Sequence, residues 1–361
     1  MKKNTGLYLF IIVVIFSLFG LLMIYSSSYI WALYKFNDSL RYVKLQGIFL
    51  FIGIILMLFI RKIDYRVYYK YAKYIFIICL ILLVLVLIPG IGKIRNGSRS
   101  WFGIGSLGIQ PSEFMKLGLL ILVSKYLSDN NKKIKNFIKG ILPVLFLLGI
   151  VFFLIMLQPD FGTGMIIVLS ILSLLFIAGA NMKFFFIAGF IGIIGIVILI
   201  LIAPYRMDRI ISFINPWSDP LGTGFQIIQS LYAIGPGGIF GLGLFNSRQK
   251  HFYLPEPQTD FIFSIISEEL GIVGILLVSF CFISILYLGI KIALNSRNLF
   301  SKYLSFGITF QILIQAAMNL MVVVGLIPVT GVTLPFLSYG GSSLLITLCS
   351  VGILLNISRE I

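Results

Sequence analysis

Long apolar runs alternate with short polar segments along nearly the whole chain of 361 residues. The runs approach the ~20 residues that an α-helix needs to cross the hydrocarbon core of a bilayer. The eighth run is too long for one upright crossing, so its first turns are expected at the interface, with the crossing beginning near Leu270. The pattern predicts an all-α polytopic membrane protein, a single transmembrane domain over 1–361. Its ten expected spans are 7–25, 45–60, 74–90, 110–127, 141–157, 162–180, 184–203, 261–290, 303–327 and 336–356.

Composition agrees with this pattern and narrows the chemistry. Hydrophobic residues make up 59% of the chain and charged residues 11%, against about 25% charged in ordinary soluble domains. The three cysteines, at positions 79, 281 and 349, lie inside apolar runs, and His251 is the single histidine. A disulfide framework, a thiolate or histidine metal site and a Ser-His-Asp triad are therefore not expected. No nucleic-acid partner is expected either.

The distribution of basic residues predicts the orientation. Most of the 28 lysines and arginines fall in segments that share a side with both chain ends. Because basic residues favour the cytoplasmic side, both ends are predicted to be cytoplasmic, and 204–260 becomes one long extracytoplasmic loop. The middle of this loop, 229–245, mixes apolar residues with glycines, which predicts a short interfacial helix followed by a turn packed against protein.

Two of the outer segments are nevertheless basic, against the insertion bias. Arginine forks suit pyrophosphate and carboxylate groups, so these cations are candidates to hold an anionic substrate. Contacts with lipid headgroups are the alternative interpretation. The basic residues are Lys93, Arg95 and Arg99 in one segment and Arg206, Arg209, Arg248 and Lys250 in the loop 204–260.

Asp260 ends this loop immediately before the eighth apolar run, in a chain with only 12 acidic residues. A carboxylate at the membrane boundary can accept a proton while nearby cations hold an anion. The alternative is an acidic helix N-cap. Ser264 and Ser267 fall within roughly 40° of Asp260 around the expected helix. They predict a polar stripe beneath the acid and a wet groove, which the polar segment 328–343 could line or simply pack against.

Three charged residues lie in the outer half of the predicted bilayer. Glu113 and Lys116 share a face of the fourth span at i,i+3 spacing, and Asp160 lies where the fifth span gives way to the sixth. A Lys116–Asp160 pair would remove two costly lone charges and brace three helices. Structural bracing and direct substrate contact both remain open for these side chains.

Five ordered segments resemble the SEDS family (shape, elongation, division and sporulation), and the resemblance covers essentially the whole chain. Further segments, at 216–217, 229–238 and 253–257, are closer to the division and sporulation branch, with FtsW and SpoVE, than to the RodA branch. The five ordered segments are 96–101, 110–116, 158–163, 254–261 and 335–343.

The resemblance implies a ten-helix peptidoglycan glycosyltransferase that polymerises lipid II on the outer face of the cytoplasmic membrane. Asp260 would be the catalytic residue, Arg99 and Trp101 would lie near the substrate cavity, and Glu113, Lys116 and Asp160 would match charged positions needed for function. Gln258 stands where the family is expected to carry His, so a hydrogen-bonding role fits this side chain better than proton transfer. The implied partners are a class B penicillin-binding protein, which supplies transpeptidation, and other cell-wall synthesis proteins.

The resulting hypothesis is an inverting transfer with release of undecaprenyl pyrophosphate, in which Asp260 acts as the base and the nascent glycan strand is the product. No cofactor is required, and no outer carboxylate pair argues for a divalent cation at the pyrophosphate. A lipid II flippase or transporter and a scaffold that recruits a penicillin-binding protein are the alternatives. The expected location is the cell membrane, at the division septum or the forespore.

Overall fold

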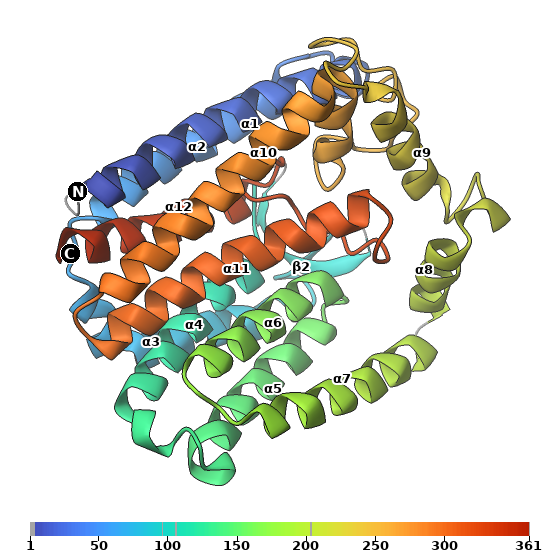
Figure 1. Ribbon diagram of the computed structural model, residues 1–361. Helices are drawn as coiled ribbons and strands as arrows, with labels where there is room; N and C mark the ends of the chain where they lie inside the picture. The colour runs from blue at the N-terminus through green and yellow to red at the C-terminus, as the bar shows by residue number, and fades with distance from the viewer. Residues whose placement is uncertain (1–3, 96, 105–106, 203, 361) are drawn as a thin grey trace.

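The computed structural model describes residues 4–95, 97–104, 107–202 and 204–360, and it is mainly helical (Figure 1). Its long helices run side by side as a bundle, and both chain ends lie at the same end of this bundle. Their bounds are α1 Thr5–Phe36, α2 Arg41–Ile60, α3 Tyr65–Leu85, α4 Pro111–Asp129, α5 Leu142–Met156, α6 Phe161–Ile177, α7 Met182–Ile202, α10 Ile262–Asn295, α11 Leu299–Val323 and α12 Gly341–Ile357.

Seven helical stretches of the described chain are long and apolar enough to cross a membrane. Two further apolar helices are shorter, at Phe161–Ile177 and Met182–Gly195, and α4 occupies the fourth predicted span. The helical class is confirmed, whereas ten crossings and the orientation stay predictions. The seven stretches are Thr5–Phe36, Arg41–Ile60, Tyr65–Leu85, Phe137–Met156, Ile262–Asn295, Leu299–Val323 and Gly341–Glu360.

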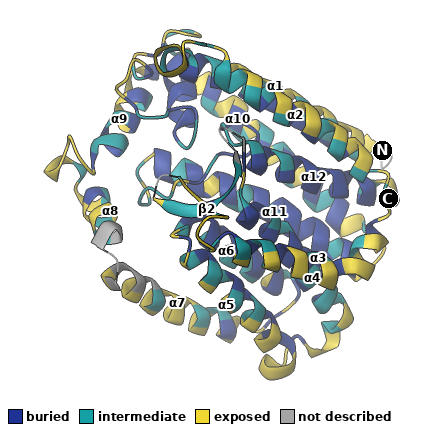
Figure 2. Cartoon of the chain, turned by 180° about the vertical axis from the view of Figure 1, so that it is seen from behind, coloured by how far each residue is buried: buried dark blue, intermediate teal, exposed yellow. Residues whose placement is uncertain are grey.

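The helices differ strongly in how far they are buried. Nearly every residue of α12 is buried, and α11 is largely buried as well (Figure 2). A helix that is apolar all round suits such a central position. In contrast, α7 runs along one edge of the bundle and leaves many large apolar side chains exposed, among them Phe186, Phe190 and Leu201. The core of the protein therefore lies around α11 and α12.

A small sheet precedes α4, and it was not predicted. Its strands, β1 Lys93–Arg95, β2 Ser98–Ile104 and β3 Leu107–Ile109, pair antiparallel in the order β1-β2-β3. Register places Lys93 opposite Trp101. The sequence does hold a signal for the first turn, because Asn-Gly between two short runs, here at 96–97, favours a two-residue hairpin.

The segment 204–260 contains short helices and turns at the end of the bundle opposite the two chain ends (Figure 1). Its helices are α8 Pro204–Ile214 and α9 Phe225–Ile234, and a glycine-rich turn follows α9 and packs against α10. The predicted short helix and packed turn are therefore present. The long α10 is broken at Gly271, where φ is 61° and ψ is −148°, one residue beyond the point at which the upright crossing was expected to begin.

Candidate active site

Asp260 lies in the turn before α10, at the end of the bundle that carries the segment 204–260. The Thr259 hydroxyl contacts Asp260 Oδ1 at 2.9 Å. The backbone oxygen of Asp260 accepts a hydrogen bond of 2.6 Å from the Asn319 amide on α11. No side chain caps the start of α10, whose N-cap residue is Phe261. The carboxylate is thus not used as the helix cap of the alternative interpretation.

The surroundings of Asp260 change its acidity. Burial raises the pKa of the Asp260 carboxyl above its usual range, and the Glu256 carboxylate raises it further. The Thr259 hydroxyl and the Arg209 charge oppose this rise. A carboxyl whose pKa moves toward neutrality is a better match for a general base than a fully solvated one.

Among the predicted cations whose side chains are described, Arg209 is the one whose charge acts on Asp260. It extends from α8 and also donates a 2.9 Å hydrogen bond to the Val329 carbonyl in the segment between α11 and α12. The side chain of Arg206 lies outside the described residues. Arg248 is exposed and lines a separate pocket.

Lys250 is placed differently from the prediction. Its side chain is fully buried, and its ammonium pairs with Glu269 at 2.9 Å. In this structure it cannot reach a ligand on the outer surface, because the charge is sealed against a helix. The prediction that Lys250 holds substrate is corrected to a structural pairing.

Ser264 and Ser267 also require correction. Both are buried, and the Ser264 hydroxyl bonds the Ser230 hydroxyl of α9 at 2.8 Å. Ser267 donates to the Phe263 carbonyl within the same helix. These hydroxyls fasten α10 to α9 and to its own backbone, so they line no wet groove. Angles around one helix could not show that α9 covers this face.

Arg99 and Trp101 lie on β2, with different partners. Arg99 Nη1 donates to the Leu87 carbonyl at 3.5 Å, while the guanidinium of Arg95, rather than that of Arg99, lies 5.1 Å from the centre of the Trp101 ring. Trp101 is partly buried. The cation at the tryptophan is therefore Arg95, whereas the family resemblance had implied Arg99 as the partner of Trp101.

Aromatic and basic residues from distant segments gather next to Gln258, two residues before Asp260 in the chain. The Tyr339 backbone amide donates to the Gln258 carbonyl at 2.8 Å, and the Tyr339 and Tyr42 rings meet edge to face at 5.0 Å. Burial raises the pKa of the Tyr339 hydroxyl, and the charges of Arg95 and Arg41 oppose that rise. We call Arg41, Tyr42, Arg95 and Tyr339 the outer cluster. Its members come from α2, β1 and the segment before α12, and no spacing in the sequence joins them.

Glu113, Lys116 and Asp160, the three charges predicted to lie within the membrane, are close together, but the predicted Lys116–Asp160 pair is absent. Lys116 Nζ lies 2.8 Å from Glu113, one turn away on α4, and 2.7 Å from Gln315 Oε1 on α11. Asp160 instead caps α6 through the Thr163 amide and accepts a 2.7 Å hydrogen bond from Gln110. The helix end and an amide side chain thus take the contacts that the prediction had assigned to the lysine.

Two amides on α11 join these charges to Asp260. Gln315 donates to the Thr333 carbonyl at 3.0 Å, and Asn319, one turn further along α11, donates to the Val332 carbonyl at 2.7 Å as well as to Asp260. Sequence reasoning missed both. Polar side chains four residues apart in an apolar run, facing a polar segment, were the available signal.

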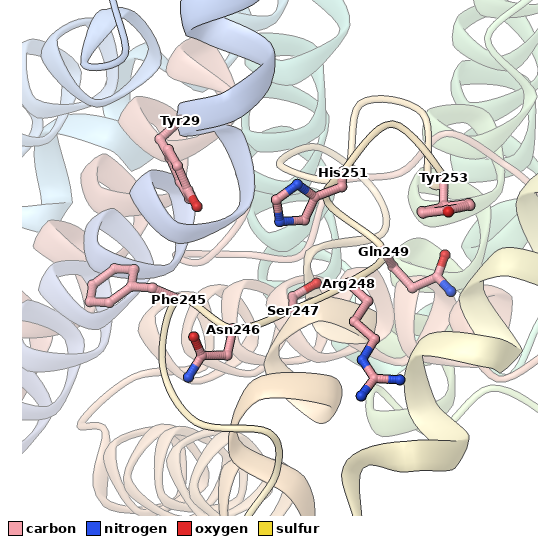
Figure 3. A pocket seen from close by; sticks show the side chains of 8 residues that line it. All are labelled: Tyr29, Phe245, Asn246, Ser247, Arg248, Gln249, His251 and Tyr253. Carbon is pink, nitrogen blue, oxygen red and sulfur yellow. The ribbon is translucent and has the colours of Figure 1, made fainter.

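An open pocket of about 680 Å³ lies further out, where α1 meets the segment 245–253 (Figure 3). Rings from both sides face it, and its described lining carries Arg248 and no carboxylate. The lining residues are Tyr29, Phe245, Asn246, Ser247, Arg248, Gln249, His251 and Tyr253.

Known proteins match this chain over nearly its full length. Residues 7–361 match the FtsW/RodA/SpoVE family model, described as "Cell cycle protein". The chain is 53% identical over 358 residues to stage V sporulation protein E of Bacillus subtilis, covering 99% of this chain and 98% of that protein. It is 40% identical over 359 residues to the "Probable peptidoglycan glycosyltransferase FtsW" of Geobacter sulfurreducens, covering 99% and 96%.

Solved structures agree in fold. A chain of a structure described as "Structural coordination of polymerization and crosslinking by a peptidoglycan synthase complex" matches with a TM-score of 0.79 at 30% identity, covering 98% of this chain and 97% of that one. The rod shape determining protein RodA of Thermus thermophilus matches with a TM-score of 0.72 at 27% identity, covering 98% and 96%. With a family match over nearly its full length, this chain belongs to the FtsW/RodA/SpoVE family of cell cycle proteins.

Proposed function

We propose that the protein is a peptidoglycan glycosyltransferase that polymerises lipid II, with Asp260 as its general base. The observation that carries this proposal is the environment of Asp260: a partly buried carboxyl whose pKa is raised by burial and which feels the charge of Arg209. Membership of the family and the names of its glycosyltransferase relatives support the same reaction.

In the proposed step, Asp260 removes the proton from the 4-hydroxyl of the acceptor GlcNAc. That oxygen attacks the anomeric carbon of the donor MurNAc, the bond to the pyrophosphate oxygen breaks, and undecaprenyl pyrophosphate departs with inversion. The proton ends on Asp260 and the electron pair on the leaving phosphate. One carboxyl is sufficient, because the leaving group is already a stable anion and needs no general acid.

Arg209 and the arginines of the outer cluster beside Gln258 are proposed to hold the pyrophosphate and stabilise the departing charge. Arg209 is the first candidate because its charge acts on Asp260, and Arg41 and Arg95 of the outer cluster join it. Arg206 and Arg99 stay candidates from the sequence. No cofactor is part of this scheme, and a divalent cation at the pyrophosphate is not required by it.

The proposed orientation has ten crossings, both chain ends in the cytoplasm and 204–260 outside. The placement of both ends at one end of the bundle and of α8 and α9 at the other supports it (Figure 1). A class B penicillin-binding protein is the proposed partner, supported by the likeness to a chain in a polymerisation and crosslinking complex. The sporulation relative supports action at the forespore, and the FtsW relatives support action at the septum.

Purified protein incubated with labelled lipid II tests the function, with and without the partner. Asp260→Asn should lose at least about a hundredfold in polymerisation rate, the usual worth of a general base, while still inserting into the membrane. Asp219→Asn is the matched control, because this exposed acid of the same outer segment closes a local turn, accepting from the amides of Gly222 and Thr223 and from the Thr223 hydroxyl. Glycan ladders from Asp260→Asn at the wild-type rate would refute the assignment. Movement of lipid II between leaflets without glycan ladders would identify a flippase. If the protein with its partner produced no ladders and moved no lipid II, a scaffold would be the remaining function.

A further inference from the structure

The break in α10 divides the helix into an outer segment, Ile262–Leu270, and an inner segment that continues to Asn295. In an unbroken helix, the amides of Ile272 and Val273 would donate to the carbonyls of Glu268 and Glu269. Here they donate instead to Gly238 and Ile239, at 3.0 and 3.2 Å. Two helical hydrogen bonds across the break are therefore replaced by contacts with the glycine-rich turn.

The glycine-rich turn 237–243 fills the break. The carbonyls of Glu268 and Glu269, freed by the break, accept from the amides of Leu242 and Gly243 at 2.9 and 3.0 Å. The turn therefore satisfies the backbone groups on both sides of the break. The turn thus connects the outer and the inner segment of α10 through backbone hydrogen bonds.

Side chains cannot be accommodated at this junction. A Cβ on Gly271 would lie 2.5 Å from the Gly241 nitrogen and 2.6 Å from the Gly238 oxygen. The positive φ of Gly271 is also one that other residues avoid. The close packing of the glycine-rich turn against Gly271 therefore requires glycine at position 271.

Two adjacent buried carboxylates fasten a second stretch of loop to the outer segment. Glu268 accepts hydrogen bonds from the Ser247 hydroxyl and, at 2.9 Å, from the Arg248 amide. Glu269 accepts from Lys250 Nζ at 2.9 Å and from the Ser26 hydroxyl of α1. Both glutamates are almost completely buried. Burying two adjacent carboxylates is costly unless each is fully hydrogen-bonded, and these contacts meet that requirement.

The geometry points to Glu268, Glu269 and Gly271 as positioning residues. They fix the base Asp260 relative to the segment 245–253, here called the pocket loop, which lines the open pocket and carries Arg248. Asp260 immediately precedes the outer segment of α10, and Glu268 is two turns further along this segment. Glu268 in turn holds the backbone of Arg248, and Gly271 gives the segment an orientation that the rest of α10 does not impose. This inference rests on the proposed function, because positioning matters only if Asp260 performs chemistry.

Gly271→Ala is the principal test. The new Cβ excludes the glycine-rich turn and disfavours the positive φ, so the outer segment should realign with the inner segment of α10 and displace Asp260. We expect kcat for lipid II polymerisation to fall by about a hundredfold, the scale of a 1 Å misplacement, while KM changes by less than about threefold, because no substrate-contacting side chain is removed. The matched control is Gly235→Ala, whose new Cβ meets nothing within 4 Å and whose φ of −57° is an ordinary helical value.

Both variants are compared as folded, monodisperse protein, so that a loss of stability does not count as a loss of rate. Wild-type kcat in folded Gly271→Ala would overturn the inference. Failure of the wild type itself to polymerise lipid II with its partner would instead overturn the proposed function.

A double-mutant cycle keeps the inference testable if Gly271→Ala does not fold. Ser247→Ala and Glu268→Gln each weaken the same contact between the pocket loop and the outer segment. Each should lower kcat/KM. The kcat/KM of the double variant should be no lower than that of the less active single variant, since two changes to one contact are not additive. Fully additive losses, or no loss in either single variant, would count against a positioning role.

Discussion

Two lysine–carboxylate pairs in the described chain are buried, and they have opposite surroundings. Glu113 and Lys116 pair at 2.8 Å within one turn of α4. They face a small cavity of about 10 Å³, about the size of one water molecule. Lys250 and Glu269 pair at 2.9 Å with no exposed surface at all. The lysine also lies over the ring of Tyr29, at 5.0 Å.

The difference shows how burial decides what a charge can do. A sealed pair must keep every partner, because a charge left alone in a dry site is very costly. A pair beside a polar cavity can exchange partners with amides, hydroxyls or a water molecule. Lys250–Glu269 is therefore a brace, while Lys116 is connected through Gln315 to the segment between α11 and α12 that Asn319 also holds.

The largest expected effect is on stability at the sealed pair. Lys250→Met should lower the free energy of unfolding by about 3–5 kcal/mol, because Glu269 keeps a buried charge without its cation. Adding Glu269→Leu should recover much of this loss, since an apolar pair replaces an ionic one. Unfolding titrations in detergent would measure both variants. The control is Arg248→Met, at an exposed neighbouring residue, which should change the free energy of unfolding by no more than about 0.5 kcal/mol. An equal loss of stability in Lys250→Met and Arg248→Met would contradict the role of Lys250 as a brace.

Asp260 extends the comparison to a partly buried carboxyl that lacks a paired lysine. Its raised pKa places the acidic limb of the rate profile at a higher pH than an ordinary aspartate would give. The rate should fall about tenfold per pH unit below that pKa, because only the ionised base accepts a proton. Rates of lipid II polymerisation across a pH series would locate the limb, and a rate that is flat down to the usual range of aspartate would argue against Asp260 as the base.

The sign for stability is opposite to that for activity. Because the folded-state pKa of Asp260 is raised, its protonated form is the one that the fold favours. Its contribution to stability is fully present below the unfolded-state pKa and is lost as pH rises through the folded-state pKa. Asp260→Asn should therefore be at least as stable as the wild type at neutral pH, while it is inactive.

Lys116→Met should have a smaller effect on stability than Lys250→Met and a distinct effect on rate. The cavity beside Glu113 can supply a water molecule, and the carboxyl can take up a proton, so the charge need not stay unsatisfied. The rate should fall by about tenfold, on the scale of a perturbed polar network. Steady-state rates of folded protein would measure it. A stability loss as large as that of Lys250→Met would abolish the distinction between the two pairs.

The smallest expected effect is at Ser264. Ser264→Ala removes the hydrogen bond to Ser230 and should lower stability by about 1 kcal/mol, with no change in polymerisation rate. Thermal unfolding and rate measurements on the same preparation would test this. A large fall in rate at full stability would restore the groove that the helical angles had predicted.

The accuracy of the sequence predictions depended on the distance between the residues involved. Apolar runs predicted where the helices lie, because each helix is held by its own backbone hydrogen bonds. The bounds were less accurate: α1 ends at Phe36 instead of residue 25, and α3 begins at Tyr65 instead of residue 74. The importance of Asp260 was visible from its place between a polar loop and an apolar run. The Lys116–Asp160 pair and the serine stripe were wrong, because each depended on neighbours from another helix: Gln110 and Thr163 for Asp160, and α9 for Ser264.

The sequence by itself determined the helical class, the family, the membrane-scale runs and the one acid at the loop end, because these depend on residue type and local spacing. Only the tertiary structure decided that Lys250 is sealed against Glu269, that Arg95 rather than Arg99 meets Trp101, and that a glycine turn enters the break in α10. Those outcomes depend on which distant backbone atoms come within hydrogen-bonding distance when the helices pack, and local periodicity carries no information about such distances.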